Sequence, residues 1–172
     1  MKDNLLIIGA GAYGLVAREI AVDMNIFNKI DFIDDLRDST PEGTKALGTT
    51  EMLDGLSNDY TCAVVDIGNA NARLSIIEKL KNTSFKIVSL ISPKAYISPV
   101  AKIMPGCIVE PMAVVHARAF LDEGCIVSAG AVINHESVCG RCSHIDCNAT
   151  VASSATVPEM TKVCYSTVFE NK

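Results

Sequence analysis

From Ala95 to the C-terminus the sequence repeats with a period of six residues, and no other pattern in the chain restricts its fold as strongly. Successive hexads read AYISPV, AKIMPG, CIVEPM, AVVHAR, AFLDEG, CIVSAG, AVINHE, SVCGRC, SHIDCN, ATVASS, ATVPEM, TKVCYS and TVFENK. The first position always carries Ala, Cys, Ser or Thr. The third position is apolar throughout and carries Ile97, Ile103, Val109, Val115, Leu121, Val127, Ile133, Cys139, Ile145, Val151, Val157, Val163 and Phe169.

A period of six matches neither an amphipathic helix nor a simple strand, whose periods are about 3.6 and 2. It is typical of a parallel β-helix, in which short strands form three flat faces and one coil takes about eighteen residues. We expect the third position to point inward and the small first position to fit where the chain turns. The alternative is a β-sandwich of short strands, but sandwiches do not keep a six-residue register over so many repeats.

Length and composition allow one large or two small domains. The chain has 172 residues, of which 49% are apolar, and it contains no Trp. A net charge of −5 argues against a nucleic-acid partner. The N-terminal sequence MKDNLLIIGAGAYG lacks the layout of a signal peptide, and no apolar run approaches the ~20 residues that span a bilayer. We therefore expect a cytoplasmic protein without a membrane contact.

The cysteines are odd in number, which in a chain without an export signal favours reduced thiols. They are Cys62, Cys107, Cys125, Cys139, Cys142, Cys147 and Cys164. The spacing C-x2-C-x-H-x2-C, with His144 between the last two of its cysteines, could suggest zinc. On a prism these side chains would point along different faces, so we predict no metal.

Residues 1–92 read as alternating strands and helices, and residues 93–172 as the repeat domain. Apolar runs predict strands at residues 4–8, 30–33, 61–67 and 85–90, and helical spacing predicts helices at about residues 15–24 and 70–80. Ser92 and Pro93 mark the border. This order implies a small, Rossmann-like α/β domain with a parallel sheet, whose ligands gather at the carboxyl ends of the strands.

The first strand runs into GAGAYG, a G-x-G-x-x-G loop formed by Gly9, Gly11 and Gly14. Such glycines let the backbone approach a phosphate at the positive end of the next helix. Asp34 follows at the distance of a ribose-binding acid, so NAD is one possible ligand. The domain, however, is only one mononucleotide-binding half, which favours a nucleotide diphosphate. A third possibility is a loop that only turns the chain.

The combination of GAGAYG, IGNANAR and repeats containing INHESVCGRCSHIDC resembles the bacterial sugar O- and N-acyltransferases of the left-handed β-helix class. The closest resemblance is to sialic acid O-acetyltransferases and to N-acetyltransferases of UDP-linked 4-amino sugars. It implies left-handed coiling and a homotrimer. It further implies that the front domain holds a nucleotide sugar or a sialic-acid-like substrate, and that acetyl-CoA, the co-substrate, lies in the groove between adjacent prisms.

The same resemblance assigns the catalytic residues. The His of the family's His-Glu pair is the proposed general base, which corresponds to His135 with Glu136 beside it. A neutral imidazole suits this role near neutral pH, and position five of its hexad should face outward. His144 corresponds to a second histidine at the acetyl-CoA, and we place Ser128 there as well. His116 has no such partner and reads as an ordinary outward residue.

In the front domain the resemblance places the substrate on the glycine loop, on Asp34 or Asp35, and on the turn Gly68-Asn69. Arg73, one helical turn later, could reach a phosphate or face solvent. The sequence departs from the family at Tyr13, where relatives commonly have His near the sugar phosphates. Relatives also continue for further coils and a tail that helps hold CoA, so this chain could bind CoA weakly or not at all.

Three hypotheses follow from the sequence. The first is an acetyl-CoA-dependent acetyltransferase for the amine or hydroxyl of a nucleotide-activated amino sugar or sialic-acid-like sugar in surface-glycan synthesis. The second is a shortened, weakly active or regulatory trimer that binds a nucleotide sugar without transferring acetyl. The third is an NAD-binding protein.

Overall fold

The computed structural model describes residues 3–171, whose contacts divide the chain into two compact units, residues 1–90 and 91–172. We refer to them as the front unit and the prism. The predicted border lay two residues later, between residues 92 and 93. Within residues 3–171 no helix is both long and apolar enough to cross a membrane.

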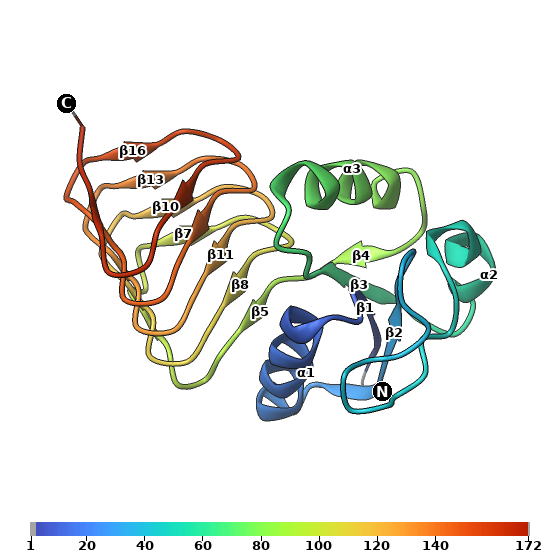
Figure 1. Ribbon diagram of the computed structural model, residues 1–172. Helices are drawn as coiled ribbons and strands as arrows, with labels where there is room; N and C mark the ends of the chain where they lie inside the picture. Colours follow the sequence, from blue (N-terminus) through green and yellow to red (C-terminus); the bar gives the residue numbers. More distant parts are fainter. Residues whose placement is uncertain (1–2, 172) are drawn as a thin grey trace. The chain divides into compact units, whose positions relative to one another are not determined.

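The front unit is a parallel four-stranded sheet in the order β2-β1-β3-β4, with α1 and α3 on opposite faces (Figure 1). Its elements are β1 (Asp3–Ile8), α1 (Ala12–Met24), β2 (Phe27–Ile33), η1 (Thr50–Met52), α2 (Leu53–Leu56), β3 (Cys62–Val65), α3 (Ala70–Leu80) and β4 (Lys86–Ile87). The apolar runs of β1 and β3 are buried on both faces, as central parallel strands require. The α/β fold predicted for this part is confirmed.

The predicted helix over residues 70–80 coincides with α3. The first helix begins three residues earlier than predicted, at Ala12, because Gly11 already serves as its N-cap residue. The short η1 and α2 were not predicted. The predicted last strand is divided, since β4 stays in the front-unit sheet whereas β5 (Leu90–Ile91) joins a face of the prism.

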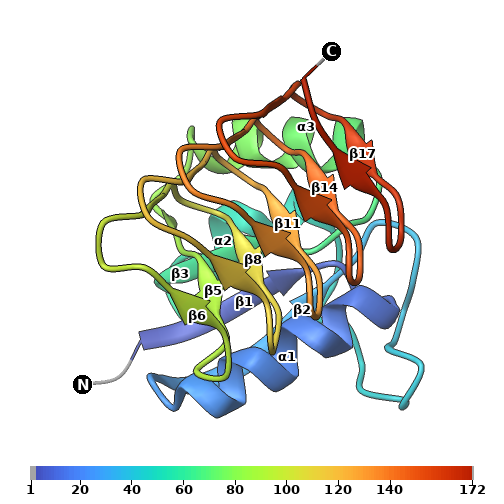
Figure 2. The same cartoon turned by 90° about the vertical axis from the view of Figure 1, so that its left-hand side faces the viewer.

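The prism is a parallel β-helix with three faces, as the hexads predict (Figures 1 and 2). One face has the order β17-β14-β11-β8-β5, whose strands lie side by side in Figure 2; the others have the orders β16-β13-β10-β7 and β18-β15-β12-β9-β6. The strands are β6 (Tyr96–Ile97), β7 (Lys102–Ile103), β8 (Ile108–Val109), β9 (Val114–Val115), β10 (Phe120–Leu121), β11 (Ile126–Val127), β12 (Val132–Ile133), β13 (Val138–Cys139), β14 (His144–Ile145), β15 (Thr150–Val151), β16 (Thr156–Val157), β17 (Lys162–Val163) and β18 (Val168–Phe169). Paired residues are eighteen apart, as in Val127 with Ile145.

Both the third and the first hexad positions form the core. Val127 and Ile145 are fully buried, and so are the first-position residues Ala113, Ala131 and Ala149. Small side chains are therefore needed inside the prism, where two inward residues of each hexad share a narrow cross-section. The expectation that they sit at the turns was wrong.

The turns fall on positions five and six of each hexad, and position six adopts a left-handed backbone conformation at eleven consecutive corners. These residues are Gly106, Met112, Arg118, Gly124, Gly130, Glu136, Cys142, Asn148, Ser154, Met160 and Ser166. Most are not glycine, although each such conformation costs about 1 kcal/mol or more. The stacked coils above and below therefore enforce a backbone shape that the local sequence does not favour.

Candidate functional site

The glycine loop follows the carboxyl end of β1, and its backbone lies close to the loop that follows β3. Gly9 has a φ of 124°, and a Cβ there would lie 2.5 Å from the carbonyl oxygen of Asp66. A Cβ at Gly14 would overlap the carbonyl oxygen of Gly9. Both glycines are therefore required by backbone packing, whereas Gly11 leaves room for a ligand.

A cavity of about 600 Å³ opens at this loop. It is lined by Ile8, Gly9, Gly11, Ala12, Tyr13, Asp34, Asp35, Leu36, Arg37, Asp66, Ile67, Gly68, Ala72 and Ile76. The structure thus brings together six of the nine residues that the sequence assigned to the substrate. The other three, Gly14, Asn69 and Arg73, do not line the cavity.

The two predicted acids fix the loops around the cavity. Asp34 accepts hydrogen bonds from the backbone amides of Ala10, at 2.7 Å, and Leu36, at 2.8 Å. Asp35 accepts bonds from the amide and the hydroxyl of Thr50, at 2.7 and 3.0 Å. Each carboxylate therefore joins the end of β2 to another loop while it lines the cavity.

Arg73 does not lie on a solvated helix face, and it is not among the residues that line the cavity. Its side chain is fully buried, and its Nη1 donates hydrogen bonds to the carbonyl oxygens of Ile67, at 2.5 Å, and Gly68, at 3.3 Å. Asn69 caps α3 by accepting a bond from the amide of Ala72 at 3.0 Å. Both side chains therefore stabilise the backbone around the loop after β3 and do not line the cavity.

Arg37 is a cavity residue that the sequence reasoning missed. It is exposed, it is the single cation among the residues that line the cavity, and its Nε would lie 3.7 Å from a Cβ built at Gly11. The sequence offered one signal for this residue, since Arg37 stands two residues after the acid pair that follows β2. A guanidinium beside a glycine loop suits recognition of a phosphate.

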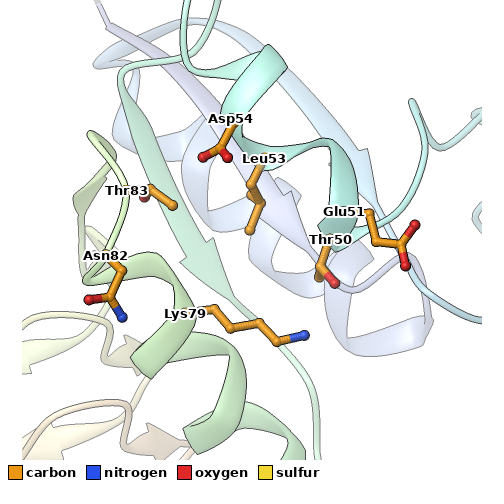
Figure 3. Close-up of a pocket in the computed structure, with 7 residues that line it drawn as sticks. All are labelled: Thr50, Glu51, Leu53, Asp54, Lys79, Asn82 and Thr83. Carbon is orange, nitrogen blue, oxygen red and sulfur yellow. The ribbon is translucent and has the colours of Figure 1, made fainter.

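A second hollow of about 300 Å³ lies on the front unit between η1, α2 and the end of α3 (Figure 3). It is lined by Thr50, Glu51, Leu53, Asp54, Lys79, Asn82 and Thr83. An adjoining hollow of about 350 Å³ shares Lys79 with it and extends to Asp35. Asp35 therefore lies between these polar hollows and the glycine-loop cavity.

In the prism, His135 lies at the corner that follows β12 and is exposed, in the outward orientation expected for position five. Its carbonyl oxygen accepts the amide of Ser154, in the next coil, at 3.0 Å. Among residues 3–171 no side-chain partner of the imidazole is found, which leaves the ring accessible. Its proposed neighbour Glu136 pairs instead with Arg118 and accepts a hydrogen bond from the Ser154 hydroxyl at 3.3 Å.

Ser128 and His144 meet, but both are buried, at 2% and 3% exposure. Ser128 Oγ lies 3.0 Å from His144 Nε2, and the same nitrogen lies 3.7 Å from Oδ1 of Asp146. Asp146 also pairs with Lys162 at 2.9 Å. Ser128, His144 and Asp146 form a buried polar cluster on the face of β11, β14 and β17, with the exposed Lys162 at its edge, rather than the open surface that a groove-bound ligand would need.

The two histidines lie on opposite sides of one prism. His135 is at the corner between the β12 and β13 faces, and His144 is on β14, in the third face. In a three-sided prism each corner is opposite one face. Because of this geometry, the two side chains can serve one reaction centre only if they come from different copies of the chain.

Val114, Ile126 and Val132 occupy the second position of their hexads, where a side chain points outward from the prism. Val114 and Val132 are half-buried, but Ile126 is already 1% exposed in the single chain. It lies between Ile108 and His144 in the adjacent coils. Ile126 is therefore not available for a contact with another subunit, and the exposed apolar side chains of this kind are Tyr96 and Val168 on the β9 and β12 face.

The front unit matches the family model described as the PglD N-terminal domain over residues 4–80. The whole chain is similar to the acetyltransferase domain of PglB from Neisseria gonorrhoeae, solved in complex with acetyl coenzyme A. The identity is 31% over 98% of this chain and 82% of that one, with a TM-score of 0.92. The chain belongs to the PglD/PglB family of hexapeptide-repeat acetyltransferases.

A second structure of the gonococcal domain matches at 29% identity, over 98% of this chain and 91% of that one, with a TM-score of 0.88. A variant of perosamine N-acetyltransferase from Caulobacter crescentus, in complex with CoA and GDP-perosamine, shares the fold. It is 22% identical over 92% of this chain and 76% of that one, with a TM-score of 0.85. The family resemblance inferred from GAGAYG and the hexads is thereby confirmed.

Proposed function

We propose that this protein transfers an acetyl group from acetyl-CoA to the amino group of a nucleotide-linked amino sugar. The observation that carries the proposal is the similarity of the whole chain to the gonococcal PglB domain, whose structure contains acetyl coenzyme A. A cavity built on a glycine loop, on the same chain, supplies a place for the nucleotide.

The cavity has the chemistry that a nucleotide diphosphate needs. The first turn of α1 follows Gly11, contains no acidic side chain and has no side-chain cap, so its N–H groups and the positive end of the helix can receive a phosphate. Arg37 adds a cation at the same place. Asp34 and Asp35 lie beyond it, where hydroxyl or N–H groups of a nucleoside could donate to their oxygens.

The acetyl transfer needs a base. As the amine nitrogen attacks the thioester carbonyl, a C–N bond forms, the C–S bond breaks and CoA leaves as its thiol. His135 accepts the proton lost by the nitrogen, and its imidazolium returns this proton to the departing sulfur, so that CoA leaves as the thiol; a neutral and accessible imidazole can perform this role. The assignments of Ser128 and His144 to acetyl-CoA stay predictions, because in the single chain both side chains are buried.

The working form we propose is a homotrimer. An exposed corner histidine cannot by itself enclose a thioester, and the histidine half a coil away lies on the opposite side of the prism. A neighbouring prism beside His135 would supply the missing wall. The apolar Tyr96 and Val168, exposed at 56% and 66%, favour such a contact.

The proposal is tested by release of CoA thiol from acetyl-CoA with UDP-linked and GDP-linked 4-amino sugars. The matched control is the same nucleotide sugar with a hydroxyl in place of the amine. We expect thiol release only with an amine, and an acetamide product by mass spectrometry. Equal release with the hydroxyl analogue would indicate O-acetylation. If no sugar gives thiol release but calorimetry detects UDP binding, the result would favour the second hypothesis, a trimer that binds a nucleotide sugar without transferring acetyl.

A further inference from the structure

Three residues stack along the corner that carries His135. Arg118, Glu136 and Ser154 occupy position six of successive coils, eighteen residues apart, with φ values of 61°, 62° and 58°. Their side chains share the same left-handed backbone geometry and therefore leave the corner in similar directions. The stack places a cation, a carboxylate and a hydroxyl in adjacent coils.

Both oxygens of the Glu136 carboxylate are engaged within this stack. Oε1 pairs with the guanidinium of Arg118, and Oε2 accepts a hydrogen bond from the Ser154 hydroxyl at 3.3 Å. Among residues 3–171 no hydrogen bond joins Glu136 to the imidazole of His135. The carboxylate is thus held along the stacking direction, toward the coils above and below, and not toward its neighbour in the same coil.

Few of the described residues at positions five and six of this corner carry a charge. At the corner that carries His135, positions five and six of successive coils are occupied, among the described residues, by Pro99, Val100, Ala117, Arg118, His135, Glu136, Ser153, Ser154 and Asn171. Ala117 and Ser153, which occupy the position of His135 in the adjacent coils, carry no charge. Arg118 and Glu136 are therefore the charged residues at these two positions, and the other titratable or charged groups that flank this corner are His116, Lys102 and Glu170.

We propose that Arg118 is a positioning residue for the acetyl transfer, which fixes Glu136 and neutralises its charge beside His135. This inference rests on the proposed function, in which His135 is the base. A bare carboxylate would favour the imidazolium form of the histidine, which cannot accept a proton. A bare guanidinium would favour the neutral form. With both residues present, their charges at this corner sum to zero.

The test is the pH dependence of kcat/KM for Arg118→Gln, Glu136→Gln and the double variant. On the acid side, Arg118→Gln should move the midpoint upward by about half a pH unit, the size expected for an exposed pair. Glu136→Gln should move it downward by a similar amount, and the double variant should return close to the original. Arg118→Lys should restore most of the profile.

Arg141 provides the matched control. Its guanidinium pairs with Glu123 in the preceding coil at 2.6 and 2.9 Å, eighteen residues away, but at a different corner. Arg141→Gln removes a similar pair and should leave the profile unchanged. The inference is overturned if Arg118→Gln and Arg141→Gln have the same profile, or if Arg118→Gln and Glu136→Gln shift it in the same direction. A fully active His135→Ala would remove His135 as the base and this inference with it, whereas the proposed function fails only if the unchanged protein transfers no acetyl group to any nucleotide-linked amino sugar.

Discussion

The backbone amide of Ala10 donates a 2.7 Å hydrogen bond to Oδ2 of Asp34, and this bond ties the glycine loop to the end of β2. Oδ1 of the same carboxylate accepts the amide of Leu36. An acid that sequence patterns associate with a ribose therefore has a second task, because it also holds two walls of the cavity at a fixed separation.

Asp34→Ala should weaken the binding of UDP or GDP at least tenfold and lower the stability of the front unit by about 1–3 kcal/mol, because two backbone amides lose a charged acceptor. Isothermal calorimetry and urea unfolding measure the two effects. Asp34→Asn keeps one acceptor oxygen and should lie between. Asp38→Ala, an exposed acid in the same loop, is the control and should change neither quantity.

Arg37→Ala should reduce nucleotide affinity about tenfold without changing the melting temperature, since an exposed guanidinium contributes to phosphate binding more than to folding. Calorimetry with UDP at two salt concentrations should also show a weaker salt dependence. Arg18, exposed on α1 and outside the cavity, is the matched control. An equal loss in Arg18→Ala would mean that the effect is one of net charge alone.

His135→Ala should lower kcat by about two to four orders of magnitude, which is typical for loss of a general base. The melting temperature should hardly change, because the side chain is exposed. His116→Ala serves as the comparison. That ring is half-buried against Tyr96, with 6.4 Å between ring centroids, and should affect stability more than turnover. Full activity in His135→Ala would remove the residue from the mechanism.

Val127→Asp should prevent the prism from folding, because it places a carboxylate at a fully buried position in a narrow apolar core. Circular dichroism and solubility report the loss. Val168→Asp, at a position that is 66% exposed, introduces the same group outside the core and should still fold. A soluble Val127→Asp protein with native ellipticity would contradict the register.

Burial raises the pKa of Glu110 above its ordinary value of 4.5, opposed by hydrogen bonds from the amide of Ala129 and from Ser128. A raised pKa means that the folded state favours the protonated acid. Its stabilising contribution is complete below pH 4.5 and is lost as the pH rises through the folded pKa. Glu110→Gln should therefore raise the melting temperature at pH 7–8 and have little effect near pH 4, as followed by thermal melts across that range.

The sequence predicted the parts of this fold that repeat. Thirteen hexads determine which residues enter the core, so Val127 and Ile145 could be assigned from periodicity alone. The bounds of α3 followed from helical spacing after the turn Gly68-Asn69, and the structure shows in addition that Asn69 caps the helix. The glycine cavity was also predictable, because carboxyl ends of parallel strands meet at one edge of a sheet.

The unpredicted parts depend on contacts between distant residues. Arg73 is spaced like a solvated helix residue, yet it is buried because two carbonyl oxygens of the preceding loop accept its guanidinium. His144 and Ile126 occupy nominally outward positions and are nevertheless buried. The pairing of Glu136 with Arg118 across one coil needs the eighteen-residue stack, which a linear reading of the His-Glu dipeptide does not reveal.

The corners of the prism have a consequence for how such a chain can change over time. Folding information resides in two inward positions of each hexad, and the corner conformation is imposed by neighbouring coils whatever side chain is present, from Gly130 to Met160. The side chains of corner residues such as His135 therefore contribute little to the packing of the core. New chemistry can be tried there, one substitution after another, while the winding of the chain stays the same.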